Sequence, residues 1–126
     1  MAVSMSMPIL IVDDYNTMIR VLRNLLRQLG FSNIDEASDG HAALNKLKAK
    51  EYKLVISDWD MSGMTGAELL RHVRSSDRYR NTPVLMIASD ASAGAATQRG
   101  GASTYIVKPL SAPTLKAKLV SVLGNF

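Results

Sequence analysis

Residues 52–60 read YKLVISDWD, and this stretch decides the fold. Its centre, Leu54 to Ile56, is continuously apolar instead of alternating, which is typical of a strand covered on both faces in a parallel sheet. The strand ends on Asp58, at the edge where open α/β sheets bind their ligands. A second apolar run, residues 9–12, also ends on acid, the pair Asp13-Asp14. If the two strands are parallel neighbours, three carboxylates converge in one crevice.

The rest of the chain alternates short apolar runs with amphipathic segments. Further strands are expected at 34–37, 84–88 and 105–107. Helices are expected from a cap at Asn16 to Gly30, after Asp39-Gly40, from Gly66 to Val73, over the alanine-rich 91–100, and over 113–123. Five strand and helix repeats predict right-handed crossovers and an α/β fold, a parallel sheet with helices on both faces.

The composition is that of one globular domain. The chain has 126 residues, 47% of them hydrophobic and 21% charged, enough to bury roughly two thirds of the unfolded surface. We expect residues 1–7 to be a loose, flexible tail and 8–126 to be a single domain. No cysteine is present, which excludes disulfides and thiolate metal sites. Neither a signal peptide nor a run long enough to span a membrane is found, so a cytoplasmic location is predicted.

The net charge of +4 raises the question of a nucleic-acid partner. The 15 basic residues are scattered, with loose groups at Arg20, Arg23 and Arg27 and at Arg74, Arg78 and Arg80. The first group has helical spacing opposite an apolar stripe, which is typical of a solvated helix face. No aromatic residues interleave with either group, so DNA or RNA binding remains the weaker interpretation.

Three strand ends supply Asp13, Asp14, Asp58 and Lys108. Two carboxylates about 4 Å apart repel by ~4 kcal/mol at an effective dielectric of 20, so three of them favour a divalent cation. Oxygen ligands without His or Cys indicate Mg²⁺. A metal and an ammonium beside one carboxylate would stabilise a transferring phosphoryl group while that carboxylate acts as nucleophile. Surface acids that merely end strands remain an equal alternative on spacing alone.

Several motifs together resemble the receiver domain of bacterial response regulators, and among these the single-domain chemotaxis regulators of the CheY type. The motifs are IVDD at 11–14, VISDWDM at 55–61, MTGAELL at 64–70, GASTY at 101–105 and Lys108-Pro109. The likeness spans nearly the whole chain after the tail. It implies a flavodoxin-like (βα)5 sandwich with strand order 2-1-3-4-5.

The resemblance also implies a role for each site residue. Asp58 would be the phosphoacceptor, and the Mg²⁺ site would comprise Asp13, Asp14, Asp58 and the main-chain carbonyl of Asp60. Asp14 would bind the metal directly and Asp13 would hold metal-bound water. Two further positions match the family: Lys108 would pair with the acceptor and then with its phosphoryl group, and Tyr105 would be the aromatic switch that turns inward on activation.

The sequence departs from the family pattern in four places. Ser62 replaces a usual proline, Thr65 replaces a frequent acid, and the stretch before Gly101 is short. Most seriously, Ala88 stands where the family has a Ser or Thr that bonds the phosphoryl oxygen. In a regular strand Ser89 faces away from position 88, so it would replace that hydroxyl only through a bulge or a register shift. We therefore expect weakened readout of phosphorylation.

The resemblance predicts a monomeric response regulator, without an output domain, in a phosphorelay of chemotaxis or motility. It would take its phosphoryl group from a histidine kinase of the CheA type and act by binding a flagellar switch protein or another output protein. It would catalyse only its own phosphorylation and dephosphorylation, so it is not expected to be an enzyme otherwise. A phosphate sink for a shared kinase is an alternative. A less favoured one is a Mg²⁺-dependent phosphatase, because Asp58 and Asp60 have the spacing of a nucleophile and a general acid.

Overall fold

Five strands alternate with five helices in the computed structural model, which describes residues 3–126. The strands are β1 (Ile9–Val12), β2 (Ile34–Ala37), β3 (Leu54–Asp58), β4 (Val84–Ala88) and β5 (Thr104–Val107). The helices are α1 (Asn16–Gln28), α2 (Gly40–Ala49), α3 (Gly66–Ser75), α4 (Ala91–Arg99) and α5 (Ala112–Leu123). All strand pairs are parallel, in the order β2-β1-β3-β4-β5, which confirms the expected flavodoxin-like sheet.

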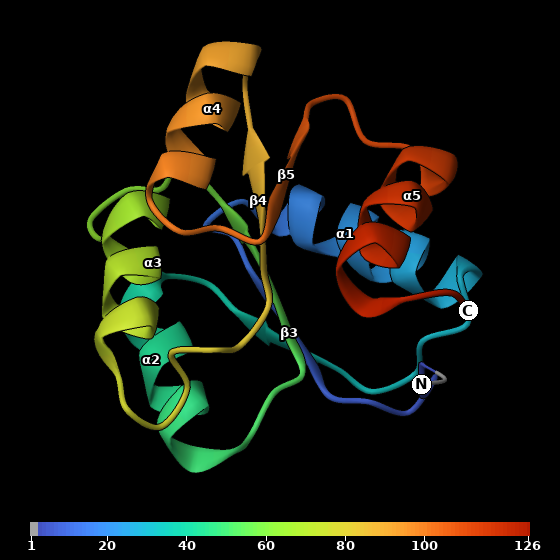
Figure 1. Cartoon of the computed structure of the whole chain (residues 1–126), viewed down its shortest axis with the longest axis horizontal. Helices are drawn as coiled ribbons and strands as arrows, with labels where there is room; N and C mark the ends of the chain where they lie inside the picture. Colours follow the sequence, from blue (N-terminus) through green and yellow to red (C-terminus); the bar gives the residue numbers. More distant parts are fainter. Residues whose placement is uncertain (1–2) are drawn as a thin grey trace.

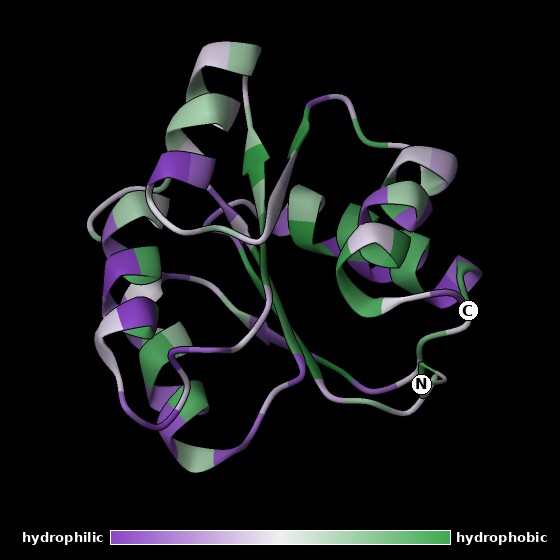
Figure 2. Ribbon diagram, in the orientation of Figure 1, coloured by the Kyte–Doolittle hydropathy of each residue, from purple (hydrophilic) through white to green (hydrophobic). Residues whose placement is uncertain are grey.

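The helices cover both faces of the sheet (Figure 1), with α1 and α5 on one side and α2 and α3 on the other. A hydrophobic core lies on each face of the sheet, and successive strand residues point into the two cores alternately. Ile9 and Ile11 pack under α1 and α5, while Leu10 and Val12 pack under α2 and α3. The central strands β1 and β4 are therefore apolar along their whole length, and β3 is apolar up to Ile56, as Figure 2 shows, whereas the edge strand β2 carries Asp35 and Glu36. For these three strands continuous apolar runs were the right signal, because all of their residues are buried.

The beginning of the chain differs from the expected loose tail. Residues 1 and 2 of the expected tail, 1–7, lie outside the described residues. Met5 packs against the core on the α1 side, and its carbonyl accepts the backbone N–H of Ser32 at 3.1 Å. Apolar side chains at 3, 5 and 7 give this segment area to bury. Over 3–7 the chain is thus packed and hydrogen-bonded.

The start of α1 also differs from its prediction. Asn16 was expected to cap the helix, but it is the first helical residue, and the cap position is Tyr15, whose side chain makes no cap hydrogen bond. The Tyr15 N–H instead donates to Asp13 Oδ1 at 2.9 Å. An acid that bonds the backbone two residues ahead forms a local turn that competes with the usual cap. The helix consequently begins directly beside the acid cluster.

The alanine-rich segment does form a helix, α4, with Asp90 as its side-chain cap. Gly94 lies against the ring of Tyr105, where a Cβ would collide with the ring atoms. The glycine therefore lets Tyr105 lie directly on the helix. Lys118 Nζ also lies over this ring, 5.2 Å from its centroid. No helix within residues 3–126 has the length and apolar character needed to cross a membrane.

Arg74 connects α3 to two loops. Its Nε donates to the carbonyl of Gly101 at 2.9 Å, and its guanidinium also donates to the carbonyls of Arg80 at 2.9 Å and Thr82 at 2.7 Å. These acceptors are neutral carbonyls, and burial lowers the pKa of the guanidinium. The planar fork of donors suits this arrangement because one side chain can satisfy several carbonyls at fixed angles.

Arg74→Met is expected to lower the free energy of unfolding by about 2 to 4 kcal/mol, because it leaves several carbonyls without their charged donor. Urea unfolding would measure the change. Arg71→Met, on the exposed face of the same helix, is the matched control and should stay within about 0.5 kcal/mol of the parent. Equal losses in both variants would show that these hydrogen bonds contribute nothing specific.

Candidate functional site

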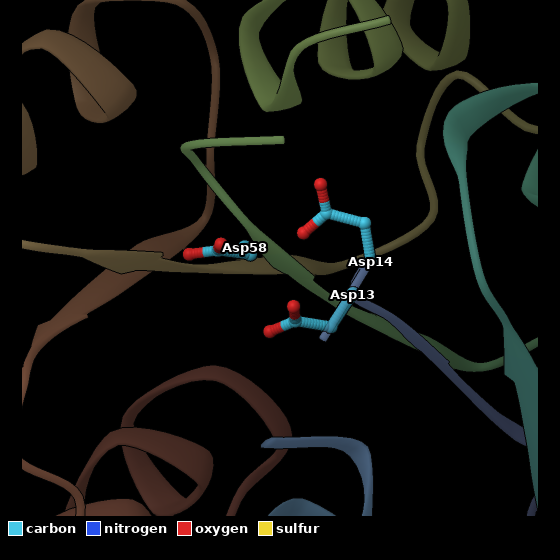
Figure 3. A group of neighbouring side chains, drawn as sticks. All are labelled: Asp13, Asp14 and Asp58. Atoms are coloured by element: carbon cyan, nitrogen blue, oxygen red, sulfur yellow. The ribbon is translucent and has the colours of Figure 1, made fainter. Parts of the chain in front are cut away.

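Three carboxylates lie together at the carboxyl ends of β1 and β3 (Figure 3). The two strands are parallel neighbours, and Val12 pairs with Ser57, so the residues that follow, Asp13 and Asp58, fall side by side. Asp13, Asp14 and Asp58 each offer an oxygen, and these oxygens all lie within 4.8 Å of one another. The sheet register thus brings together the acids that the sequence placed at two strand ends.

The three acids differ in their surroundings. Asp13 and Asp58 are 1% and 4% exposed, whereas Asp14 is exposed. Asp58 Oδ1 lies 3.3 Å from Lys108 Nζ, an ion-pair distance without hydrogen-bond geometry. Asp14 Oδ2 accepts the backbone N–H of Ser62 at 2.8 Å. Lys108 is held beside β4, since its N–H donates to the carbonyl of Ala88 at 3.0 Å.

These surroundings shift the pKa values in opposite directions. Burial raises the pKa of Asp13 from 3.8 to about 6, against the lowering effect of the Tyr15 N–H, and the charge of Asp58 adds to the rise. Burial also raises the pKa of Asp58, although the Lys108 ammonium opposes it. The Ser62 N–H lowers the pKa of Asp14. Two buried carboxylates are therefore held in a place that disfavours their own charge.

The arrangement fits a hard divalent cation. Asp13 Oδ2 and Asp58 Oδ1 are buried and have no hydrogen-bond partner. Buried polar atoms are rarely left without a partner unless an ion, a water or a catalytic role accounts for them. A cation held by Asp13, Asp14 and Asp58 would satisfy both oxygens, and an all-oxygen donor set is the one that Mg²⁺ prefers.

Without added metal, the protein is expected to lose stability as the pH rises from about 4 to 6. The raised pKa of Asp13, about 6 against 3.8 unfolded, means that the folded state binds more protons in this window, so stability falls with rising pH. The shift corresponds to at most about 3 kcal/mol. Urea unfolding at pH 4.5 and 7 would measure it, and Asp13→Asn should flatten the profile. An unchanged profile in that variant would contradict the assignment.

The residues around position 88 form the other half of the crevice. Ala88 is fully buried and ends β4 in regular register with β5. The β4–β5 pairing has no bulge at this point, so the Ser89 side chain does not occupy the position of Ala88. Its Oγ instead donates to Asp60 Oδ2 at 2.7 Å. Tyr105 is half-buried against α4, and its predicted movement stays a prediction.

Two features of the site escaped the sequence reading. Thr65 was treated as a loop change, but its side chain and Glu68 form a complete capping box at the start of α3. The pattern Thr-x-x-Glu before an apolar run is a known helix-start signal and would have found it. The contact between Ser62 and Asp14 joins residues 48 positions apart. No local sequence pattern predicts a backbone contact between residues so far apart in the chain.

Comparison with known proteins agrees with this geometry. A family model, the response regulator receiver domain, matches residues 9–120. Chemotaxis protein CheY-3 of Vibrio cholerae serotype O1 is 47% identical over 116 residues, which cover 90% of this chain and 89% of that protein. Chemotaxis protein CheY4 of Vibrio cholerae superimposes with a TM-score of 0.84 at 31% identity, over 94% of this chain and 99% of that one. A chain of the CheX-CheY-BeF3-Mg complex of Borrelia burgdorferi gives 0.83 at 31% identity, over 92% and 88%. With these matches over the same strands and helices, the chain belongs to the response regulator receiver family.

Proposed function

We propose that this receiver takes a phosphoryl group from the phosphohistidine of a kinase onto the carboxylate of Asp58, in a Mg²⁺-dependent reaction. The observation that carries the proposal is the buried Asp58 at the end of the central strand, with the Lys108 ammonium at 3.3 Å and two further acids beside it. Its relative CheY-3 is a chemotaxis protein. The Borrelia burgdorferi complex contains Mg²⁺ and BeF3, as its name states.

In the transfer, an oxygen of Asp58 attacks phosphorus, the O–P bond forms, and the P–N bond to the kinase histidine breaks. The electron pair of that bond stays on the imidazole nitrogen, which later picks up a proton from solvent. Asp58 needs its charged form, which exists above its raised pKa. Mg²⁺ held by the acid cluster would neutralise charge on the phosphoryl oxygens.

Lys108 supplies the second positive charge of the site. Its ammonium lies 3.3 Å from Asp58 Oδ1 and would hold the nucleophile in place before transfer. The same ammonium can follow the charge from the carboxylate to a phosphoryl oxygen, because the lysine side chain is flexible and only about a third exposed. Asp13 and Asp14 have no partner of this kind and remain for the metal.

The proposed setting is chemotaxis signalling in the cytoplasm, with a kinase of the CheA type as donor and a protein that binds the phosphorylated form as output. Two observations favour a phosphate sink as a second candidate. Ala88 offers no hydroxyl to sense the phosphoryl group, and α4 carries mostly small side chains. A phosphatase is not favoured, since the Asp60 carboxylate that would act as general acid is hydrogen-bonded to Ser89.

Mass spectrometry of the intact protein tests the proposal. Incubation with phosphoramidate, a small donor that carries a P–N bond, should add one phosphoryl group when Mg²⁺ is present and none when EDTA is in excess. The added group should be labile to hydroxylamine, as an acyl phosphate is. No added mass with Mg²⁺, or several added groups per chain, would contradict an acceptor at this site.

A further inference from the structure

One side-chain hydrogen bond joins the loop after β3 to the loop after β4. Ser89 Oγ donates to Asp60 Oδ2 at 2.7 Å, across 29 positions of sequence. Among residues 3–126 it is the only side-chain hydrogen bond between these two loops. The next residue, Asp90, uses its own carboxylate to cap α4, where Oδ1 accepts the N–H of Ala93 at 2.8 Å. Ser89 thus carries the one hydroxyl of this loop, and that hydroxyl donates to Asp60.

Asp60 lies at the rim of the acid cluster and not in it. Asp13, Asp14 and Asp58 bring their oxygens within 4.8 Å of one another, and Asp60 is not among them. Asp60 is nevertheless close to Asp58, which it follows by two residues. Burial is the main cause of the raised pKa of Asp58, and the charge of Asp60 raises it further.

Asp60 shares a groove with one member of the cluster, Asp14. Asp60 lines a groove of about 540 Å³ together with Asp14 and Trp59. A carboxylate released from Ser89 therefore has room to rotate toward Asp14. The side-chain torsions of an exposed aspartate change with little cost, so the hydrogen bond is what selects the present orientation.

We infer that Ser89 is a positioning residue that holds the Asp60 carboxylate at the rim of the groove and thereby weakens divalent-cation binding by the acid cluster. The inference rests on the magnesium site of the proposed function. Cation affinity of oxygen sites rises with the number of carboxylate charges. With Ser89 present, the cation is bound by the three acids Asp13, Asp14 and Asp58. Without the Ser89 hydrogen bond, the carboxylate of Asp60 can approach as a fourth acid.

Mg²⁺ titration followed by the fluorescence of Trp59, the single tryptophan of the chain, tests the inference. Ser89→Ala should lower the dissociation constant for Mg²⁺ roughly three- to tenfold, the effect expected of one more charge at a partly solvated site. Ser89→Thr keeps a hydroxyl and should bind Mg²⁺ like the parent. Asp60→Asn removes the charge, so adding Ser89→Ala to it should change nothing further.

The outcomes separate the inference from alternatives. A purely structural Ser89 would lower the melting temperature of the metal-free protein without tightening Mg²⁺ binding, and that result overturns the inference. An effect of Ser89→Ala that persists in the Asp60→Asn background overturns it too, because no charge is then released. If calorimetry shows that the parent binds no Mg²⁺, the metal site of the proposed function fails and the inference fails with it. Binding by the parent that Ser89→Ala leaves unchanged overturns the inference alone.

Discussion

Asp58→Asn is expected to abolish phosphorylation. The amide has nearly the same shape as the carboxylate but carries no charge and is a poor nucleophile, so the O–P bond does not form. Intact-protein mass spectrometry with phosphoramidate and Mg²⁺ should show no added group. The fold should survive, because burial disfavours the charged form of Asp58 and a neutral side chain removes repulsion with Asp13.

Asp60→Asn is the matched control for this loss. It removes one carboxylate two residues further along the same loop, at the rim of the groove, and labelling should persist. Labelling retained after Asp58→Asn would place the acceptor elsewhere, with Asp13 and Asp14 as the next candidates. Melting temperature without metal gives an independent check, because a fall of many degrees would point to a folding defect instead of a lost nucleophile.

The sequence was a sufficient guide to the strands and to the acids that end them. The buried central strands contain continuous apolar runs, so the local sequence is enough to identify them. A carboxylate at the end of such a run lies at the ligand-binding edge of the sheet. Leu54 to Asp58 shows this plainly: every residue of the strand is buried, and the acid is its last residue. The family resemblance supplied the strand order, which local patterns do not contain.

What the sequence did not provide were contacts between distant segments. Arg74 was grouped with Arg78 and Arg80 as scattered surface charge, yet it satisfies backbone carbonyls on two loops. Asn16 has good capping chemistry, but Asp13 bonds the backbone first and moves the helix start. In each case the partner was fixed by tertiary packing, which overrides a local propensity.

The acid cluster also explains why stability and function oppose one another here. Burial of Asp13 and Asp58 costs stability whenever both are charged, as the raised pKa values indicate. A bound divalent cation relieves that cost only in the folded state, so metal binding stabilises the fold by mass action. The same buried carboxylates that weaken the metal-free protein are the ones that would bind the metal and the phosphoryl group.

Gly66→Ala is expected to have the largest effect on stability among substitutions near the site. Gly66 begins α3, and its N–H donates to the carbonyl of Trp59 at 3.0 Å. A Cβ there would lie 2.7 Å from Trp59 Cα and still closer to the backbone oxygen of Asp58. Backbone atoms cannot rotate away as a side chain can, so we expect a loss of about 3 kcal/mol.

The same collision would move the acceptor. The atoms that must shift belong to Asp58 and Trp59, so the phosphorylation rate of folded Gly66→Ala should fall roughly 10- to 100-fold, as misplacement of a reacting group by about 1 Å does. Gly100→Ala is the matched control. Its Cβ would lie nearest the flexible tip of Leu70 at 3.3 Å, and the backbone oxygens of Thr97 and Ala96 would be at ordinary contact distances of 3.5 and 3.6 Å, so stability and rate should stay near those of the parent. Urea unfolding and labelling kinetics of the two variants decide the question, and equal behaviour would mean that the β3 to α3 connection tolerates a side chain at its closest approach.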